Sequence, residues 1–272
     1  IFAITPDAWD YGTVLLGYTP SRQFVFSNNG IGTLNVSNIS ISGSPYFTLA
    51  NLPTLPVSLT IGQTSSFNVV YSPTAAGAHT ATISITDNLG RVVNTVVVNG
   101  TGFDATITTL PAMENWDAVT VPALPLGWTA LVQSTVTTAY AKTVTTSPHT
   151  TPNVAALYNA TDAEATVLLI APPLATTIPV NTTRVKAWLK SSSAGYPISI
   201  GVITNPSDAS TYQEIQNIAL TTTWTQYTIP MQAYAGAGRY LAVKHGLGGT
   251  SRTLYVDEVE LEAVGANDLA AT

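Results

Sequence analysis

Three carboxylates, Glu114, Asp117 and Asp257, are the side chains of this sequence best suited to binding a metal ion. A hard cation such as calcium takes about six to eight oxygen ligands, and the edge of a β-sandwich provides them from one or two carboxylates and loop carbonyls. The sequence therefore predicts a structural calcium site through Asp257 with Glu114 or Asp117.

Asp257 lies in a run, residues 254–262, whose alternation of polar and apolar residues predicts a β-strand. Alternation places Asp257 on the face that also carries Val259 and Leu261, so its charge needs a stabilising partner. A cation is one such partner, and the backbone N–H groups of a loop are the other. Both interpretations stay open at this point. The opposite face is interpreted as a solvated acidic row, made of Glu258, Glu260 and Glu262.

Aromatic side chains are the second candidate for binding, since their apolar faces can pack against the C–H surfaces of sugar rings. Alternation puts Trp188 on the polar side of its strand, together with Lys186 and Lys190. Trp188 and the loops around Tyr140 and Tyr158 therefore make the predicted ligand-binding set. Packing against a second layer of a sandwich is the competing interpretation for each of these rings.

Catalytic signatures are absent from the sequence. The three histidines, His79, His149 and His245, stand isolated from one another and belong to no zinc-protease, nucleophile-elbow or phosphate-loop pattern. The acidic residues are few, and spacing along the chain does not reveal a carboxylate pair of the glycosidase kind. We therefore expect a protein that is not an enzyme.

The composition predicts a folded, all-β protein. Of the 272 residues 45% are hydrophobic, and 19 Gly and 17 Pro suit short strands joined by turns. Only 9 residues are Lys or Arg against 15 Asp or Glu, a net charge of −6, which argues against nucleic acid as a partner. No stretch of about 18 apolar residues is present, so no membrane span is expected. Without cysteine the chain forms no disulfide and no thiolate metal site.

Short period-2 runs separated by turn-rich stretches divide the chain into two segments. The runs within residues 1–103 predict an immunoglobulin-like antiparallel sandwich. A glycine-rich stretch marks a joint near residue 104, and the runs within residues 105–264 predict a larger jelly-roll β-sandwich. Residues 265–272 are interpreted as a linker or tail.

The first segment resembles a known group of immunoglobulin-like domains. It contains, in order, DYGTV at 10–14, N-x-G at 28–30, YSP-x-x-x-G at 71–77 and a closing NGTG at 99–102. This order is similar to the domains of the ASPM, SPD-2 and hydin group, called choice-of-anchor D in bacterial surface proteins. The resemblance covers nearly all of the segment and implies a structural or interaction sandwich rather than chemistry.

The second segment contains a further ordered set of motifs. They are MENWD at 113–117, PLGWT at 125–129, LIAPPL at 169–174, WTQYT at 224–228, YAG at 234–236 and YVDEV at 255–259. This order resembles the cleaved-adhesin, or choice-of-anchor J, jelly rolls, which are distant relatives of MAM and carbohydrate-binding sandwiches, although Trp116 takes the place of the phenylalanine usual in the first motif. The resemblance implies adhesion or binding, sometimes with a structural calcium, and it implies structural roles for Trp128 and Trp224.

These features together predict a non-enzymatic structural or adhesive segment of a secreted or cell-surface bacterial protein, such as part of a stalk, filament or surface layer. Its expected partners are other protein modules or copies of itself. The alternative interpretation is a carbohydrate- or peptide-binding accessory module of a multi-modular secreted protein, with surface glycans as partners. A chain that begins at Ile1 without a signal-peptide pattern is expected to be a processed product or an excised fragment.

Overall fold

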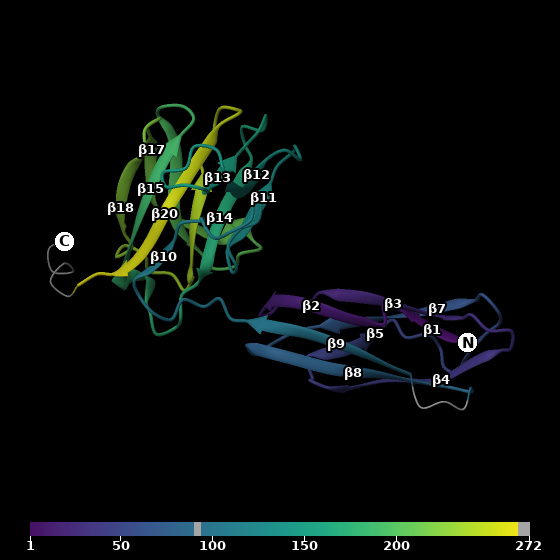
Figure 1. The fold of residues 1–272 in the computed structure, drawn as a ribbon. Coiled ribbons are helices and arrows are strands. Elements are labelled where there is room, and N and C mark those ends of the chain that lie inside the picture. The colour runs from purple at the N-terminus through teal and green to yellow at the C-terminus, as the bar shows by residue number, and fades with distance from the viewer. Residues whose placement is uncertain (90–93, 266–272) are drawn as a thin grey trace. The chain divides into compact units, whose positions relative to one another are not determined.

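The computed structural model describes residues 1–89 and 94–265, and it confirms that the protein is all-β (Figure 1). In those two ranges the helical structure amounts to two 3₁₀ turns, η1 (Val180–Thr182) and η2 (Ala209–Thr211). No helix among the described residues is long and apolar enough to cross a membrane. The chain divides into two compact units, Ile1–Asp104 and Ala105–Thr272, here called unit 1 and unit 2. Most of the tail predicted at 265–272 lies outside the described residues.

Unit 1 contains two sheets, with more strands than the runs in the sequence predict because short strands add to the edges. One sheet has the order β1-β3-β7-β5 and the other the order β2-β9-β8-β4-β6. All neighbours are antiparallel except β2 and β9, which run parallel. The strands are β1 (Phe2–Thr5), β2 (Ala8–Leu15), β3 (Ser21–Asn28), β4 (Leu34–Gly43), β5 (Phe47–Ala50), β6 (Val57–Leu59), β7 (Thr64–Tyr71), β8 (Gly77–Asp87) and β9 (Asn94–Phe103).

Alternate residues of these strands form the core of unit 1. Phe24 of β3 and Phe67 of β7 are fully buried, and their rings stack with 5.6 Å between the centroids. Ile83 and Ile85 of β8 belong to the same buried cluster, so residues of both sheets share one core. Val25, which follows Phe24, is 36% exposed on the outer side of β3. The period of two therefore separates a buried face from an outer face.

Unit 2 is the larger double-sheet sandwich, of the jelly-roll kind, since its chain passes repeatedly from one sheet to the other. The first sheet has the order β12-β13-β20-β15-β18 with β10 paired to β20, and the second has the order β11-β14-β19-β16-β17. The strands are β10 (Ala112–Glu114), β11 (Thr129–Gln133), β12 (Tyr140–Val144), β13 (Val154–Tyr158), β14 (Thr166–Pro173), β15 (Thr183–Ser191), β16 (Tyr196–Ile203), β17 (Tyr212–Leu220), β18 (Thr225–Pro230), β19 (Tyr240–His245) and β20 (Thr253–Ala263).

A β-bulge in β20 overturns the predicted placement of Asp257. Trp188 of β15 pairs with Asp257, but Lys186 pairs with Glu260, so β20 contains one residue more than its partner here. Glu258, inside the bulge, adopts a φ of 47°. The additional residue reverses the alternation, so Asp257 does not share a face with Val259 and Leu261. The residues of β20 that enter the core of unit 2 are Leu254, Val256, Val259 and Leu261.

The two faces of β3 give a direct test of the core of unit 1. We expect Phe24→Ala to lower the free energy of unfolding by about 3–5 kcal/mol, because it removes a fully buried ring and leaves a cavity. Val25→Ala, on the outer face of the same strand, should cost about 1 kcal/mol or less. Urea denaturation of the purified variants measures both values. Equal losses for the two variants would contradict the assignment of faces.

Candidate functional site

Aromatic side chains gather on the outer face of the first sheet of unit 2. They come from the open end of the β12–β13 hairpin, from β15 and β20, from the residue before β18, and from the connection 145–153 between β12 and β13. Each is partly exposed rather than buried in the core. We call this group the aromatic face, and it consists of Tyr140, His149, Tyr158, Trp188, Trp224 and Tyr255. The three predicted ligand-binding residues, Tyr140, Tyr158 and Trp188, all lie on it.

Tyr140 and Tyr158 form one end of the aromatic face. They are directly opposite each other in the β12–β13 ladder, and their ring centroids lie 5.3 Å apart. The ammonium group of Lys142 lies 4.0 Å from the centroid of the Tyr140 ring. Burial raises the pKa of the Tyr140 phenol, and the neighbouring phenols of Tyr255 and Tyr158 act in the same direction. Tyr140 is therefore neutral at physiological pH and can donate a hydrogen bond to a ligand.

Trp188 and His149 form the other end. The two rings stack with 3.9 Å between centroids and 16° between planes. Trp224 meets the edge of His149 at 5.6 Å, and Trp224 and Tyr255 meet edge to face at 6.4 Å. Lys186, Trp188 and Lys190 point away from the core, as the alternation of β15 predicts. The contacts link the four rings into a continuous aromatic surface.

Asp257 fixes the loop that carries His149. Its Oδ2 accepts hydrogen bonds from the backbone N–H groups of His149 (2.8 Å) and Thr150 (3.2 Å), and its Oδ1 accepts one from Glu258 (2.9 Å). The side chain is fully buried, and burial raises the pKa of Asp257 while these N–H groups oppose that rise. The sequence left open whether a cation or the N–H groups of a loop stabilise Asp257. The structure contains the hydrogen bonds from the loop.

Glu114 and Asp117 are likewise engaged by N–H donors. Oε1 of Glu114 accepts the backbone N–H of Trp116 at 2.7 Å, and burial raises the pKa of Glu114. Oδ1 of Asp117 accepts the backbone N–H of Asn153 at 3.2 Å, while Oδ2 accepts the Asn115 amide at 3.0 Å. Glu114 pairs with Val259 in the β10–β20 ladder, while Asp117 and Asp257 both accept backbone N–H groups of the 145–153 connection.

N–H donors engage each of the three predicted calcium ligands. Oxygens of all three carboxylates accept hydrogen bonds, and each carboxylate keeps further lone pairs with which a cation could also be bound. In the described parts of the chain no group of three acidic, histidine or cysteine side chains is placed to hold a metal. Calcium therefore stays a prediction from the sequence, and no function below depends on it.

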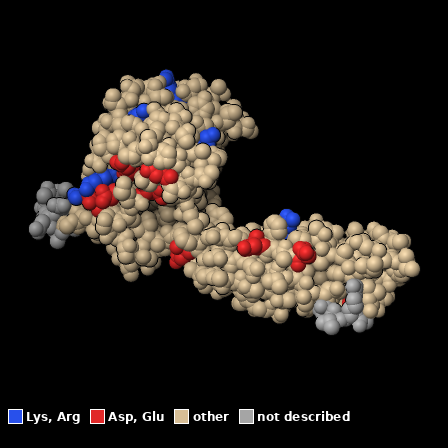
Figure 2. Space-filling view, in the orientation of Figure 1, with Lys and Arg blue, Asp and Glu red and all other residues tan. Residues whose placement is uncertain are grey.

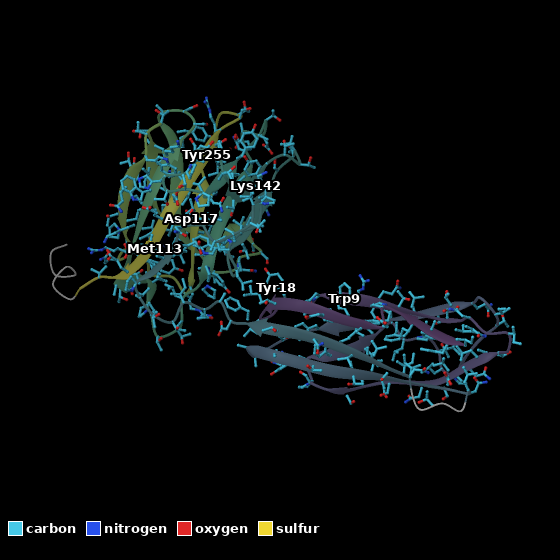
Figure 3. The ribbon with its side chains drawn as sticks, in the orientation of Figure 1. Trp9, Tyr18, Met113, Asp117, Lys142 and Tyr255 are labelled. Atoms are coloured by element: carbon cyan, nitrogen blue, oxygen red, sulfur yellow. The ribbon has the colours of Figure 1, made fainter. Side chains whose placement is uncertain are left out.

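Charge is unevenly distributed over this sheet. Glu262, near the end of β20, lies 2.6 Å from the ammonium group of Lys186 and also pairs with Arg184. Figure 2 shows the acidic side chains of unit 2 gathered across the middle of the visible face, whereas further basic side chains are spread over its upper part. Tyr255 and Lys142 lie in that upper part, away from Asp117 and Met113 (Figure 3). Most of the acidic side chains of this sheet therefore lie apart from Lys142 and Tyr255.

Sequence reasoning missed three members of the aromatic face. Trp224 was expected to be structural, and His149 and Tyr255 were not assigned a ligand-binding role, although the structure places all three beside one another. Trp128 behaves as expected, because it packs against the core and meets Trp116 edge to face at 5.2 Å. The two tryptophans differ in their surroundings. Trp224 lies just before the edge strand β18, whereas Trp128 lines a cavity beside the core of unit 2.

No family model matches this chain, and no curated protein matches it in sequence. Solved structures that resemble it include two cleaved adhesin domains of Lys-gingipain. One is 11% identical, covers 56% of this chain and 97% of that domain, and has a TM-score of 0.46. The other, from Porphyromonas gingivalis, is 16% identical, with coverages of 58% and 100% and a TM-score of 0.45. A variant of a family 29 carbohydrate-binding module is 10% identical, with coverages of 57% and 90% and a TM-score of 0.39.

The carboxylate of Asp257 should control the position of His149. We expect Asp257→Asn to lower the free energy of unfolding by about 1–3 kcal/mol, because the amide cannot accept all three N–H groups. Release of His149 from Trp188 should also change the near-ultraviolet circular dichroism of the tryptophans. Glu260→Gln, at a partly exposed carboxylate of the same strand, is the control and should change neither quantity. Identical spectra for the two variants would refute this role of Asp257.

Asp162 should stabilise the folded protein in a pH-dependent way. Its carboxylate accepts the Thr135 N–H at 2.7 Å and the Ser134 hydroxyl at 2.8 Å, ahead of β12, and these bonds lower its pKa to about 2. Because the folded pKa lies below the ordinary 3.8, the contribution is present above that value and is lost as the pH falls towards 2. Asp162→Asn should flatten the fall in stability over this range, measured by urea denaturation. An unchanged pH profile of the free energy of unfolding would contradict this role of Asp162.

Proposed function

We propose that unit 2 is a glycan-binding module of an adhesive, secreted or cell-surface bacterial protein, and that the aromatic face binds the glycan. The observation that carries this proposal is the convergence of Tyr140, Tyr158, Tyr255, Trp188 and Trp224 on one outer sheet face. A sugar ring has apolar C–H surfaces between polar hydroxyl groups. Partly exposed aromatic rings can pack against the C–H surfaces, and tyrosine hydroxyls and lysines can form hydrogen bonds with the sugar hydroxyls.

The span of the aromatic face favours a polymer over a single sugar. Its members come from β12, β13, β20 and β15, which are consecutive neighbours in the sheet. Neighbouring strands lie about 4.8 Å apart, so four strands span roughly 14 Å. A single sugar would cover only part of such a surface. A polysaccharide crossing the strands would contact rings at both ends.

The rings are held in place before any ligand arrives. Trp188 is stacked on His149, and His149 is fixed through its backbone by Asp257. Tyr140 and Tyr158 are held by the β12–β13 ladder. Ordering these side chains therefore costs little on binding, which favours affinity.

The proposal treats the chain as a binding protein and not as an enzyme. His79 is hydrogen-bonded to the Tyr71 hydroxyl at 2.7 Å, His245 is buried against backbone carbonyls, and His149 is stacked on Trp188. Each histidine therefore has a structural contact that accounts for it. Unit 1 would act as a spacer, and assembly into a stalk, filament or surface layer stays a prediction from the sequence.

Removal of the Trp188 ring tests the proposal. Wild type should be retarded in affinity gels by at least one polysaccharide of a broad panel. Trp188→Ala should weaken that binding by about 2 kcal/mol, or roughly 30-fold in Kd, because it removes both the exposed part of the indole and the ring on which His149 is stacked. Isothermal titration calorimetry with oligosaccharides of the retained polymer measures the difference.

The control is Tyr240→Ala, which removes an aromatic ring from β19 in the other sheet of unit 2. Its affinity should equal that of wild type. Circular dichroism must show that both variants are folded. Failure of the whole panel to bind, or equal binding by Trp188→Ala and wild type, would overturn the proposal.

A further inference from the structure

Two lysines lie in one row across the aromatic face. In the sheet register Lys142 of β12 is opposite Ala156 of β13, Ala156 is opposite Tyr255 of β20, and Tyr255 is opposite Lys190 of β15. Lys142 and Lys190 therefore occupy the two ends of a row of four residues, with Tyr255 between them. At the usual strand spacing the two lysine backbones are roughly 14 Å apart.

Each of the two ammonium groups lies against aromatic rings. Lys142 is 4.0 Å from the Tyr140 ring centroid, and Lys190 is 5.1 Å from the Trp224 centroid and 5.3 Å from that of Tyr255. Lys190 also donates a hydrogen bond to the Ser147 hydroxyl at 2.8 Å. These contacts hold both cations on the surface that the glycan would cover.

Neither lysine has an acidic partner among the described residues. Within them, the ion pairs of Lys and Arg side chains closer than 4.0 Å involve Lys186 and Arg184 with Glu262. Lys186 is on the same strand and the same face as Lys190, only four residues away, and its charge is balanced. Asp257 lies on the same face, two residues along β20 from the partner of Lys190, but its oxygens accept backbone N–H groups and it makes no ion pair with that lysine.

Lys190 is a partly desolvated cation. Burial lowers the pKa of its ammonium group, which means that the surroundings do not fully replace the water it has lost. Aromatic faces and one hydroxyl supply part of the missing interaction. A carboxylate on the ligand would supply the remainder, and a charge-assisted hydrogen bond is stronger than a neutral one.

We propose that the glycan bound by the aromatic face is an acidic polysaccharide whose sugar carboxylates pair with Lys142 and Lys190. This inference rests on the proposed function, because it names the class of glycan for the same surface. The chain of sugars crosses the strands from β12 to β15 along the row through Tyr255.

The test compares each acidic glycan with its own neutral form. Oligosaccharides of galacturonate, mannuronate–guluronate and glucuronate are titrated before and after chemical reduction of their carboxyl groups to alcohols. We expect at least one acidic form to bind about tenfold or more tightly than its reduced form at low salt, with the difference shrinking near 1 M salt.

Four lysine variants locate the effect. Lys142→Gln and Lys190→Gln should each weaken binding of the acidic form roughly five- to tenfold and leave binding of the reduced form unchanged. Lys142→Arg and Lys190→Arg keep the charge and should retain most of the affinity. Lys244→Gln is the matched control, because Lys244 lies over the Tyr212 ring at 5.4 Å on the other sheet of unit 2.

The outcomes separate the two proposals. Equal affinity of every acidic glycan and its reduced form would overturn this inference and leave the proposed function intact. A preference for acidic forms that survives both glutamine variants would also overturn it. Absence of binding by acidic, reduced and neutral glycans alike would overturn the proposed function and the inference together.

Discussion

The aromatic face depends on one buried carboxylate. Asp257 accepts three backbone N–H groups, two of them from the loop between β12 and β13. Those bonds bring the loop down onto β15, where His149 covers Trp188. A charge in such a place is stabilised only while its donors stay in position, so the loop and the strand fix each other. The bulge beside Asp257 is what turns this carboxylate to the outer face.

Much of the fold could be predicted from the sequence, because alternation and turn residues report on backbone and burial directly. The alternation of β15 correctly placed Trp188 on the outer face, and the composition correctly indicated an all-β protein. The bulge in β20 was missed although it leaves a mark, because the core residues change from even positions (Leu254, Val256) to odd positions (Val259, Leu261) with two polar residues between them. The error in the environment of Asp257 followed from that single residue.

The candidate site was less predictable than the fold. Tyr140 and Tyr158 are 18 positions apart, and their contact depends on a hairpin whose register the sequence does not specify. The row that joins Lys142 to Lys190 passes through β13 and β20, so it exists only once the order of strands is known. Trp224 was interpreted through its motif, and its neighbours His149 and Tyr255 arrive from distant parts of the chain. The order of the strands, more than the local sequence, decides which side chains meet at this surface.

Binding of a ligand to the outer face of the first sheet of unit 2 can be followed residue by residue. The most direct measurement follows the five tryptophan indole N–H signals by NMR while a retained oligosaccharide is added. The account predicts that the signals of Trp188 and Trp224 shift, whereas those of Trp116 and Trp128 in the same unit, and of Trp9 in unit 1, stay in place. Shifts confined to Trp128 or Trp9, with Trp188 and Trp224 unchanged, would contradict it.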